Sequence, residues 1–166
     1  MARGTFFITS RAQFPVFQTE RSPELFLDVL QSYRQQEKFS LHAFVIMPDH
    51  IHVILTLSEG VTIERSVQYL KGSFSFRAKR EIGIEHRIWQ PKYYDRRVRD
   101  QEECAAVLRY LEQNPVKRGL AERASEFPFS SANPRFLGRL DEFPEEFEIM
   151  EHKRLKAHSS GICPSD

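Results

Sequence analysis

The sequence predicts an α+β fold, with an antiparallel sheet, helices packed on one face and a further helix after the fourth strand. Three observations lead to this prediction. Strand-like and helix-like segments follow one another in the order β-α-β-β-α-β-α. The second and third strands are separated only by Pro48 and Asp49, a pair typical of tight turns. The helical segments carry apolar residues at spacings of three and four.

The first half of the chain is expected to contain three strands and one helix. Residues 4–10 are rich in β-branched and aromatic side chains, which favour a strand. Ser22 is a common type of N-cap and a proline follows it, so a helix is expected over residues 22–36. Runs of apolar residues then predict strands at 41–47 and 50–57.

The next two elements are a long helix and a strand. The helix is expected over residues 63–81, where apolar side chains recur on one side. Thr62 can cap its beginning, and Gly83 is expected to end it. Alternating residues at 93–99 then predict the fourth strand.

A third helix completes the order of elements. Asp100 and Glu103 have the spacing of a capping box, and Pro115 is expected to stop the helix. The whole order is that of the split βαβ, ferredoxin-like arrangement. In such a sheet the third strand lies in the interior, and the open sheet face can carry a site.

Positive charge is concentrated in the middle of the chain and negative charge near its end. Residues 71–99 contain nine Lys or Arg against three acidic residues, whereas residues 141–151 contain six acidic residues and no basic one. We therefore expect one domain over residues 1–138 and an acidic, partly disordered tail over residues 139–166. One hypothesis is that this tail folds over the basic face and competes with a polyanionic ligand. The alternative is that both are unrelated solvated faces.

Composition excludes several classes of protein. The two cysteines are far apart, so they indicate neither a zinc site nor a disulfide framework. No apolar run resembles a signal core or approaches the length of a membrane span. We expect a cytoplasmic protein with no membrane partner.

Two histidines, His50 and His52, stand one residue apart in the predicted third strand. Alternate side chains of a strand point to the same side, so both imidazoles leave the same face, with Cα atoms about 6.5 Å apart. Two imidazoles at this separation can converge on one metal ion. The alternative is that they are two polar residues on a solvated face.

The third helix supplies a second pair of polar residues. Tyr110 and Asn114 are four residues apart, so they share one helical face. Taken alone, Tyr110 fits the edge of a core and Asn114 fits a helix C-cap. Together with the histidines they offer a phenolic nucleophile and a metal site with two nitrogens and one oxygen. Such a set suits Mn²⁺ or Zn²⁺, and Mg²⁺ is also compatible, for polarising a phosphodiester.

These residues lie in motifs that resemble a known family. Residues 47–52 (MPDHIH) resemble the MPxHxH signature of the single-tyrosine HUH transposases. Residues 88–95 (IWQPKYYD), 110–120 (YLEQNPVKRGL) and 127–131 (FPFSS) are similar, in order and spacing, to the REP-associated tyrosine transposase subgroup. The resemblance covers residues 4–132.

The resemblance implies a fold, a reaction and a substrate. The fold is ferredoxin-like. His50 and His52 correspond to a metal pair and Asn114 to the third ligand, for Mg²⁺ or Mn²⁺. Tyr110 corresponds to the nucleophile that takes a 5′-phosphate and frees a 3′-hydroxyl. The substrate is single-stranded DNA that carries REP hairpins, and the covalent phosphotyrosine stores the bond energy, so no nucleotide cofactor is expected.

Basic and aromatic residues are candidates for DNA contact. Phosphate contacts are expected from a set of cations in the second helix, the fourth strand and the end of the third helix, namely Lys71, Arg77, Lys79, Arg80, Arg96, Lys117 and Arg118. One or two of the aromatic residues Tyr69, Phe74, Phe76, Trp89 and Tyr94 are expected to stack on bases, and the others to belong to the core.

The leading interpretation is a metal-dependent enzyme that nicks and rejoins single-stranded DNA at hairpin sites. Alternatives are a domesticated hairpin-binding protein without cleavage activity, a protein whose histidines hold a purely structural metal, and a rolling-circle-type nickase. The oligomeric state stays open between a monomer and a homodimer.

Overall fold

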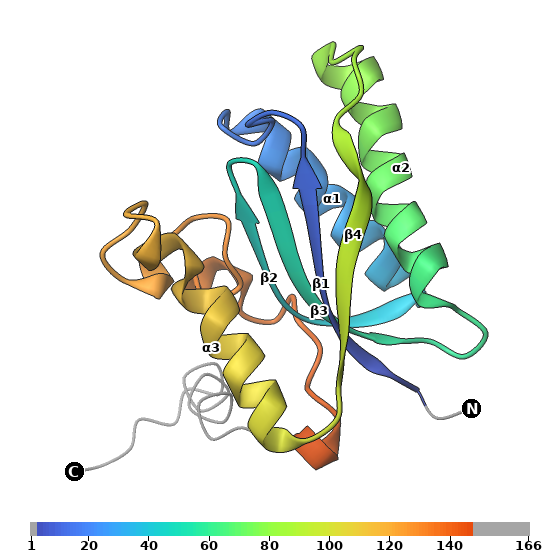
Figure 1. The fold of residues 1–166 in the computed structure, drawn as a ribbon, viewed down its shortest axis with the longest axis vertical. Helices are drawn as coiled ribbons and strands as arrows, with labels where there is room; N and C mark the ends of the chain where they lie inside the picture. The colour runs from blue at the N-terminus through green and yellow to red at the C-terminus, as the bar shows by residue number, and fades with distance from the viewer. Residues whose placement is uncertain (1–2, 148–166) are drawn as a thin grey trace.

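The computed structural model describes residues 3–147. Its seven main elements occur in the predicted order, and Figure 1 shows their arrangement. They are β1 (Thr5–Ala12), α1 (Arg21–Gln35), β2 (Phe39–Met47), β3 (His50–Leu57), α2 (Ile63–Ile82), β4 (Trp89–Val98) and α3 (Gln101–Lys117). Three short 3-10 helices follow, at Ala124–Glu126, Pro134–Phe136 and Glu145–Phe147.

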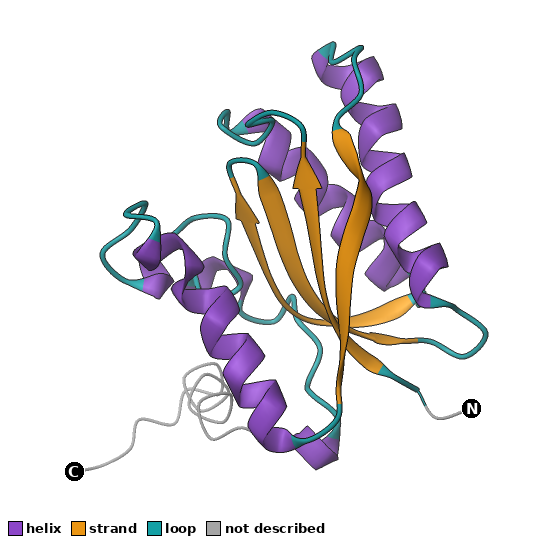
Figure 2. Cartoon of the chain, in the orientation of Figure 1, coloured by secondary structure: helices purple, strands orange, loops and turns teal. Residues whose placement is uncertain are grey.

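The four strands form one sheet in the order β2-β3-β1-β4, with every neighbouring pair antiparallel. This is the ferredoxin-like order, so the predicted fold class is confirmed. Strand β3 lies between β1 and β2, as expected. Figure 2 shows α1 and α2 together behind the sheet and α3 on the other side.

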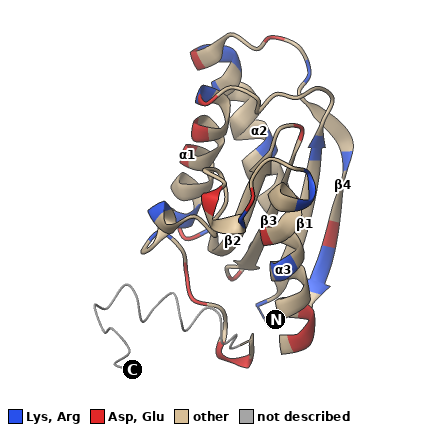
Figure 3. Ribbon diagram, turned by 90° about the vertical axis from the view of Figure 1, so that its left-hand side faces the viewer, with Lys and Arg blue, Asp and Glu red and all other residues tan. Residues whose placement is uncertain are grey.

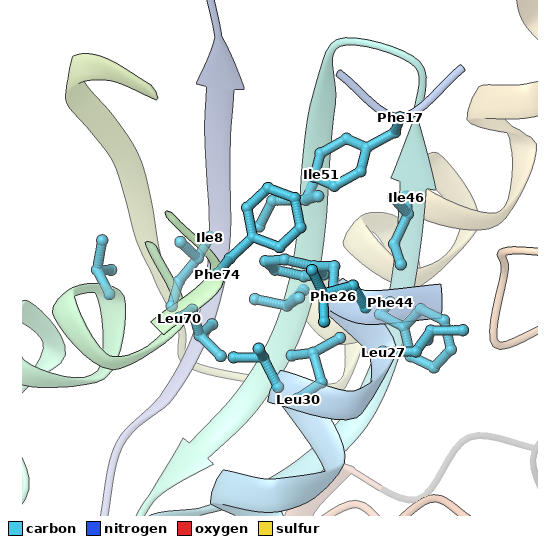
Figure 4. Close-up of a cluster of buried hydrophobic side chains, with 14 of the residues drawn as sticks. Ile8, Phe17, Phe26, Leu27, Leu30, Phe44, Ile46, Ile51, Leu70 and Phe74 are labelled. Atoms are coloured by element: carbon cyan, nitrogen blue, oxygen red, sulfur yellow. The ribbon is translucent and has the colours of Figure 1, made fainter. Parts of the chain in front are cut away.

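The main hydrophobic core lies between the sheet and the pair α1 and α2. Figure 4 shows Phe26 of α1 and Phe74 of α2 among the apolar side chains of the strands. Both rings are fully buried, and their centroids lie 5.6 Å apart in an edge-to-face arrangement. Truncating such a ring to alanine typically costs about 3–5 kcal/mol of stability.

A second, smaller core lies under α3. The apolar stripe of this helix, which includes Leu108 and Leu111, packs on Phe7, Val45 and Ile54 of the sheet. The face that the sequence analysis expected to be open is therefore partly covered by the third helix. The spacing of apolar residues predicts a buried stripe on each helix, but the sequence pattern does not say which face of the sheet a stripe covers.

Two helix ends differ from the predictions. Helix α1 begins at Arg21, one residue earlier than expected. Ser22 is therefore not the N-cap but a buried residue of the first turn, and its backbone N–H donates to the hydroxyl of Thr19. Helix α3 does not stop at Pro115 but continues to Lys117. It can continue because a proline in the last turn removes only one hydrogen bond, while the N–H of Arg118 still donates to the carbonyl of Asn114.

The predicted ends of α2 agree closely with the structure, whereas the start of β4 does not. Thr62 caps α2 by accepting a hydrogen bond from the backbone of Arg65, and Gly83 ends the helix with a φ of 71°. Strand β4 starts at Trp89, four residues before the predicted strand. Pro91 is tolerated there because β4 is an edge strand.

The chain on both sides of the predicted domain boundary at residue 138 runs along the sheet. Phe129, Ser130 and Ser131 pair with the outer edge of β2, and the N–H of Asp141 donates to the carbonyl of Leu41. Phe147 is buried beneath α3. The boundary itself remains a prediction, and the rest of the predicted tail, residues 148–166, lies outside the described residues.

Asp141 fixes this returning segment. Its carboxylate accepts two 2.9 Å hydrogen bonds from the guanidinium of Arg34 and one of 2.8 Å from the backbone N–H of Leu41. Burial raises the pKa of this carboxyl, but the hydrogen bonds from Arg34 and Leu41 outweigh it and hold the pKa below its usual value.

We predict that Asp141→Asn lowers the free energy of unfolding by about 1–2 kcal/mol at neutral pH, because a charge-assisted pair is lost. A carboxyl with a lowered folded pKa contributes its full stability above the unfolded pKa of about 4, and loses it as pH falls through the folded value. The difference between wild type and variant in urea unfolding should therefore shrink below about pH 4. An exposed control, Glu122→Gln, should show no such difference, and a pH-independent gap for Asp141→Asn would contradict the prediction.

Candidate active site

The two histidines of β3 point to the α3 side of the sheet. Their neighbours Ile51 and Val53 point the other way, into the core against α1 and α2. His50 is 1% exposed and His52 is 2% exposed, so the interpretation as polar residues on a solvated face is wrong. The ring centroids of the two histidines lie 4.9 Å apart.

His50 is held from both sides. Its Nδ1 lies 2.7 Å from a carboxylate oxygen of Asp49, and its Nε2 lies 3.3 Å from Oδ1 of Asn114. The hydrogen bond with His50 lowers the pKa of Asp49, so Asp49 is an anion that accepts the Nδ1 proton. Burial lowers the pKa of His50, and Asp49 only partly opposes this. Nε2 then carries a lone pair and faces the Asn114 oxygen, which is also an acceptor.

His52 shows the same organisation with a neutral partner. Its Nδ1 lies 2.7 Å from the hydroxyl of Thr9, and its ring stacks on Phe7 at a centroid distance of 5.3 Å. Burial, with the nearby His50, Arg11 and Arg118, lowers the pKa of His52 to about 3, so the ring is neutral at physiological pH. Its Nε2 is buried and has no hydrogen-bond partner among the described residues.

Tyr110 stands beside this pair. Its ring contacts His52 at a centroid distance of 5.4 Å and Phe7 at 6.0 Å, each edge-on. Unlike the histidines it is 47% exposed, so a large ligand can reach its hydroxyl. Tyr110 and Asn114, which the sequence placed on one helical face, both come to the histidine pair.

These donors fit a divalent metal ion. Two imidazole nitrogens with lone pairs and one amide oxygen lie together, and the buried Nε2 of His52 is otherwise unsatisfied, which is costly inside a protein. Asp49 and Thr9 hold the opposite ring nitrogens, as the outer partners of metal-binding histidines commonly do. Within residues 3–147 no three His, Cys, Asp or Glu side chains form such a group, and the further oxygen that contacts the pair is that of the Asn114 amide.

Sequence reasoning missed four residues of the site. Asp49 was interpreted only as a turn residue, although its place directly before His50 was a usable signal. Thr9, Arg11 and Phe7 come from β1, and only the pairing of β1 with β3 brings them here, with Thr9 opposite His52 and Arg11 opposite His50. No local pattern reveals that register.

The predicted DNA-binding cations of α2 belong to a helix on the other side of the sheet from α3, the helix that carries Tyr110 (Figure 1; Figure 3 shows Lys and Arg in blue). Arg77 pairs with Glu81 at 2.7 Å, and the Lys71 ammonium donates to the carbonyl of Gln90 at 3.0 Å. Lys79 and Arg80 are exposed. Their predicted contacts with phosphates remain predictions, but they are not part of the Tyr110 site.

The remaining predicted cations lie on the same side of the sheet as Tyr110. Arg96 of β4 points to the α3 face and forms a 3.3 Å ion pair with Glu103. Lys117 and Arg118 are exposed at the end of α3.

Of the candidate stacking aromatics, Phe74 and Trp89 are buried, whereas Phe76 and Tyr94 are 63% and 56% exposed. Tyr69 is half-buried. Stacking of any of these rings on bases remains a prediction.

A comparison with protein families identifies the chain. Residues 5–114 match the family model described as IS200-like transposase, which covers most of the chain and includes the histidines, Tyr110 and Asn114. The chain belongs to the IS200-like transposase family. Membership agrees with the resemblance deduced from the motifs around His50 and Tyr110.

Two proteins that are similar to this chain are described as members of the REP-associated subgroup. A protein of Haemophilus influenzae described as a REP-associated tyrosine transposase is 29% identical over 135 residues, which is 71% of this chain and 77% of the relative. The REP-associated tyrosine transposase of Escherichia coli is 29% identical over 99 residues, which is 59% of this chain and 57% of that protein.

A solved structure shows the same fold. The structure of a REP-associated tyrosine transposase bound to a REP hairpin matches with a TM-score of 0.69 over 90% of each chain, at 24% identity. In the described part of the chain, no helix has both the length and the apolar character to cross a membrane.

We predict that the site binds Mn²⁺ in the absence of DNA. Replacing His52 or Asn114 with alanine should abolish measurable binding in titration calorimetry, because each removes one donor. Asp49→Asn should weaken binding by about 10-fold, since it removes only the partner that orients His50. The exposed His86→Ala is the matched control and should bind as wild type does. Unchanged affinity in His52→Ala would refute this assignment.

Proposed function

We propose that this protein is a DNA transposase that nicks and rejoins single-stranded DNA at hairpin, REP-like sites through a covalent 5′-phosphotyrosine. The observation that carries the proposal is the meeting of four groups from two elements. His50 and His52 come from β3, and Tyr110 and Asn114 come from successive turns of α3, with the Tyr110 ring against His52.

In this proposal Tyr110 is the nucleophile. Its phenolic oxygen attacks the phosphorus, the bond to the 3′-oxygen of the preceding nucleotide breaks, and the phenolic proton passes to solvent. The 3′-oxygen then takes a proton from solvent, and the reverse reaction rejoins a strand without ATP. The half-exposed position of Tyr110 supports this role, because the phosphate of a large polymer must reach it.

His50, His52 and Asn114 would hold a divalent ion, Mg²⁺ or Mn²⁺, which supplies Lewis-acid polarisation of the phosphate when bound. The protein residues prepare for it in a defined way. Asp49 and Thr9 fix the ring orientations, and burial keeps both imidazoles neutral, so their nitrogens are available to a cation. The buried setting also strengthens electrostatic interactions with the phosphate.

The site is assembled within one chain. Helix α3 packs on the sheet of its own chain through Leu108 and Leu111, which places Tyr110 beside its own His52. We propose that a single chain carries out cleavage. The hairpin substrate is supported by the matching structure, a transposase bound to a REP hairpin.

The test is incubation of a labelled single strand containing a REP-type hairpin with the protein and Mn²⁺ or Mg²⁺. We predict that wild type forms a covalent adduct that survives denaturing electrophoresis, and that Tyr110→Phe forms none. Tyr110→Phe should bind the hairpin within about 3-fold of wild-type affinity, since it keeps the ring. EDTA should prevent the adduct in wild type.

Tyr94→Phe is the control for tyrosine substitution. Tyr94 lies near Tyr110 on the same face of the sheet, but the tyrosine ring that contacts His52 is that of Tyr110. It should still form the adduct. Hairpin binding by wild type without any adduct would instead favour the alternative of a binding protein that no longer cleaves. Efficient cleavage of single strands that lack a hairpin would favour a rolling-circle-type nickase.

A further inference from the structure

Two clefts border the site, one beside Tyr110 and the other beside His50. The first, which we call the β4–α3 groove, has a volume of about 470 Å³ and is lined by Phe7, Thr9, Arg11, Tyr94, Arg96 and Tyr110, among others. The second, the turn cleft, has a volume of about 530 Å³ and is lined by Gln13, Phe14, Asp49, His50, Gln90 and Arg118, among others. Tyr110 belongs only to the groove, and His50 only to the turn cleft.

Each cleft offers what a nucleotide needs. The groove contains the exposed ring of Tyr94 and the cations Arg11 and Arg96. The turn cleft contains the cation Arg118 and the half-buried ring of Phe14. A cation can contact a phosphate, and a ring can stack on a base.

Helix α3 and the residue that follows it bring three groups to the site in sequence. Tyr110 and Asn114 are four residues apart on one helical face, about 6 Å from each other along the axis. Arg118 directly follows the helix, and its backbone N–H still donates to the carbonyl of Asn114, so it lies about one further turn along. The ordering is nucleophile, metal-ligating amide and guanidinium. Arg118 also lines the turn cleft together with Asp49 and His50, so its guanidinium lies beside the histidine pair.

Displacement at phosphorus requires the attacking oxygen, the phosphorus and the leaving oxygen to follow one another in the same way. The attacking and leaving oxygens lie on opposite sides of the phosphorus, roughly in line. With Tyr110 at one end and the phosphate beside Asn114, the leaving 3′-oxygen is directed towards Arg118 and the turn cleft. The nucleotide that stays attached to Tyr110 through its 5′-phosphate is left on the groove side.

We propose, on the basis of the function proposed above, that α3 sets the direction of the DNA strand. The turn cleft binds the nucleotide that leaves with the 3′-hydroxyl, and Arg118 stabilises the charge on its 3′-oxygen. The β4–α3 groove binds the nucleotide that becomes linked to Tyr110.

The test compares two substrates of the same hairpin sequence. One carries the normal 3′-oxygen at the cleaved bond, and the other carries a bridging 3′-sulfur, whose thiolate leaves without needing a neighbouring cation. Arg118→Ala should cleave the oxygen substrate about 100-fold more slowly than wild type, as expected for loss of one charge-stabilising donor. It should cleave the sulfur substrate at close to the wild-type rate.

Two variants serve as comparisons. Arg109→Ala changes an exposed arginine on the same helix and should cleave both substrates as wild type does. Arg11→Ala, in the groove, should slow both substrates equally. Rescue by sulfur in Arg11→Ala instead of Arg118→Ala would mean that the strand runs in the opposite direction, and absence of rescue in both would overturn the role of Arg118.

A binding experiment distinguishes failure of this proposal from failure of the proposed function. If wild type forms no adduct with either substrate, the proposed cleavage activity is wrong. The product strand ending in a 3′-hydroxyl should still bind more weakly to Arg118→Ala than to wild type, by about 10-fold, whereas Arg11→Ala should bind it normally. Equal weakening by both variants would overturn the assignment of the two clefts.

Discussion

The packing of α3 on the sheet is the interaction on which the rest of the site depends. Leu108 and Leu111 are buried against Phe7 and Ile54, and these contacts fix both the position and the rotation of the helix. Because residues 110 and 114 lie next to the buried stripe, they arrive at the histidines as a direct result. The amide and the phenol need no loop to hold them, and their separation is that of one helical turn.

Neutral histidines in a buried position form the second constraint. A buried imidazole loses the hydration of its charged form, so burial lowers its pKa and leaves a lone pair on the unprotonated nitrogen. The Asp49 carboxylate accepts the Nδ1 proton of His50, and the Thr9 hydroxyl can accept the Nδ1 proton of His52. The result is a set of acceptors facing one another, which is unfavourable in itself and becomes favourable when a cation is present.

Much of this site could be predicted from the sequence because its elements are local. The residues His50 and His52 lie in a strand whose boundaries, 50–57, were predicted as they occur, because a two-residue turn precedes it and apolar residues fill it. Tyr110 and Asn114 share a helical face by their spacing alone. The parts that could not be predicted depend on contacts between distant segments: the hydroxyl of Thr9, the charge of Arg11, and the choice of sheet face by α3. Charge patterns along a chain carry no information about the two sides of a sheet, so they could not show that the α2 cations, which are expected to contact phosphates, lie on the other side from Tyr110.

The return of residues 129–141 along β2 has a consequence for self-association. An exposed edge strand presents unpaired backbone groups that can join a second sheet. Here the backbone groups of Phe44 and Ile46 are bonded to the returning segment, and that of Leu41 is bonded to Asp141. The β2 edge is thereby closed to strand addition, so any continuous sheet built from two copies of this chain would have to form through β4, the strand that borders the groove beside Tyr110.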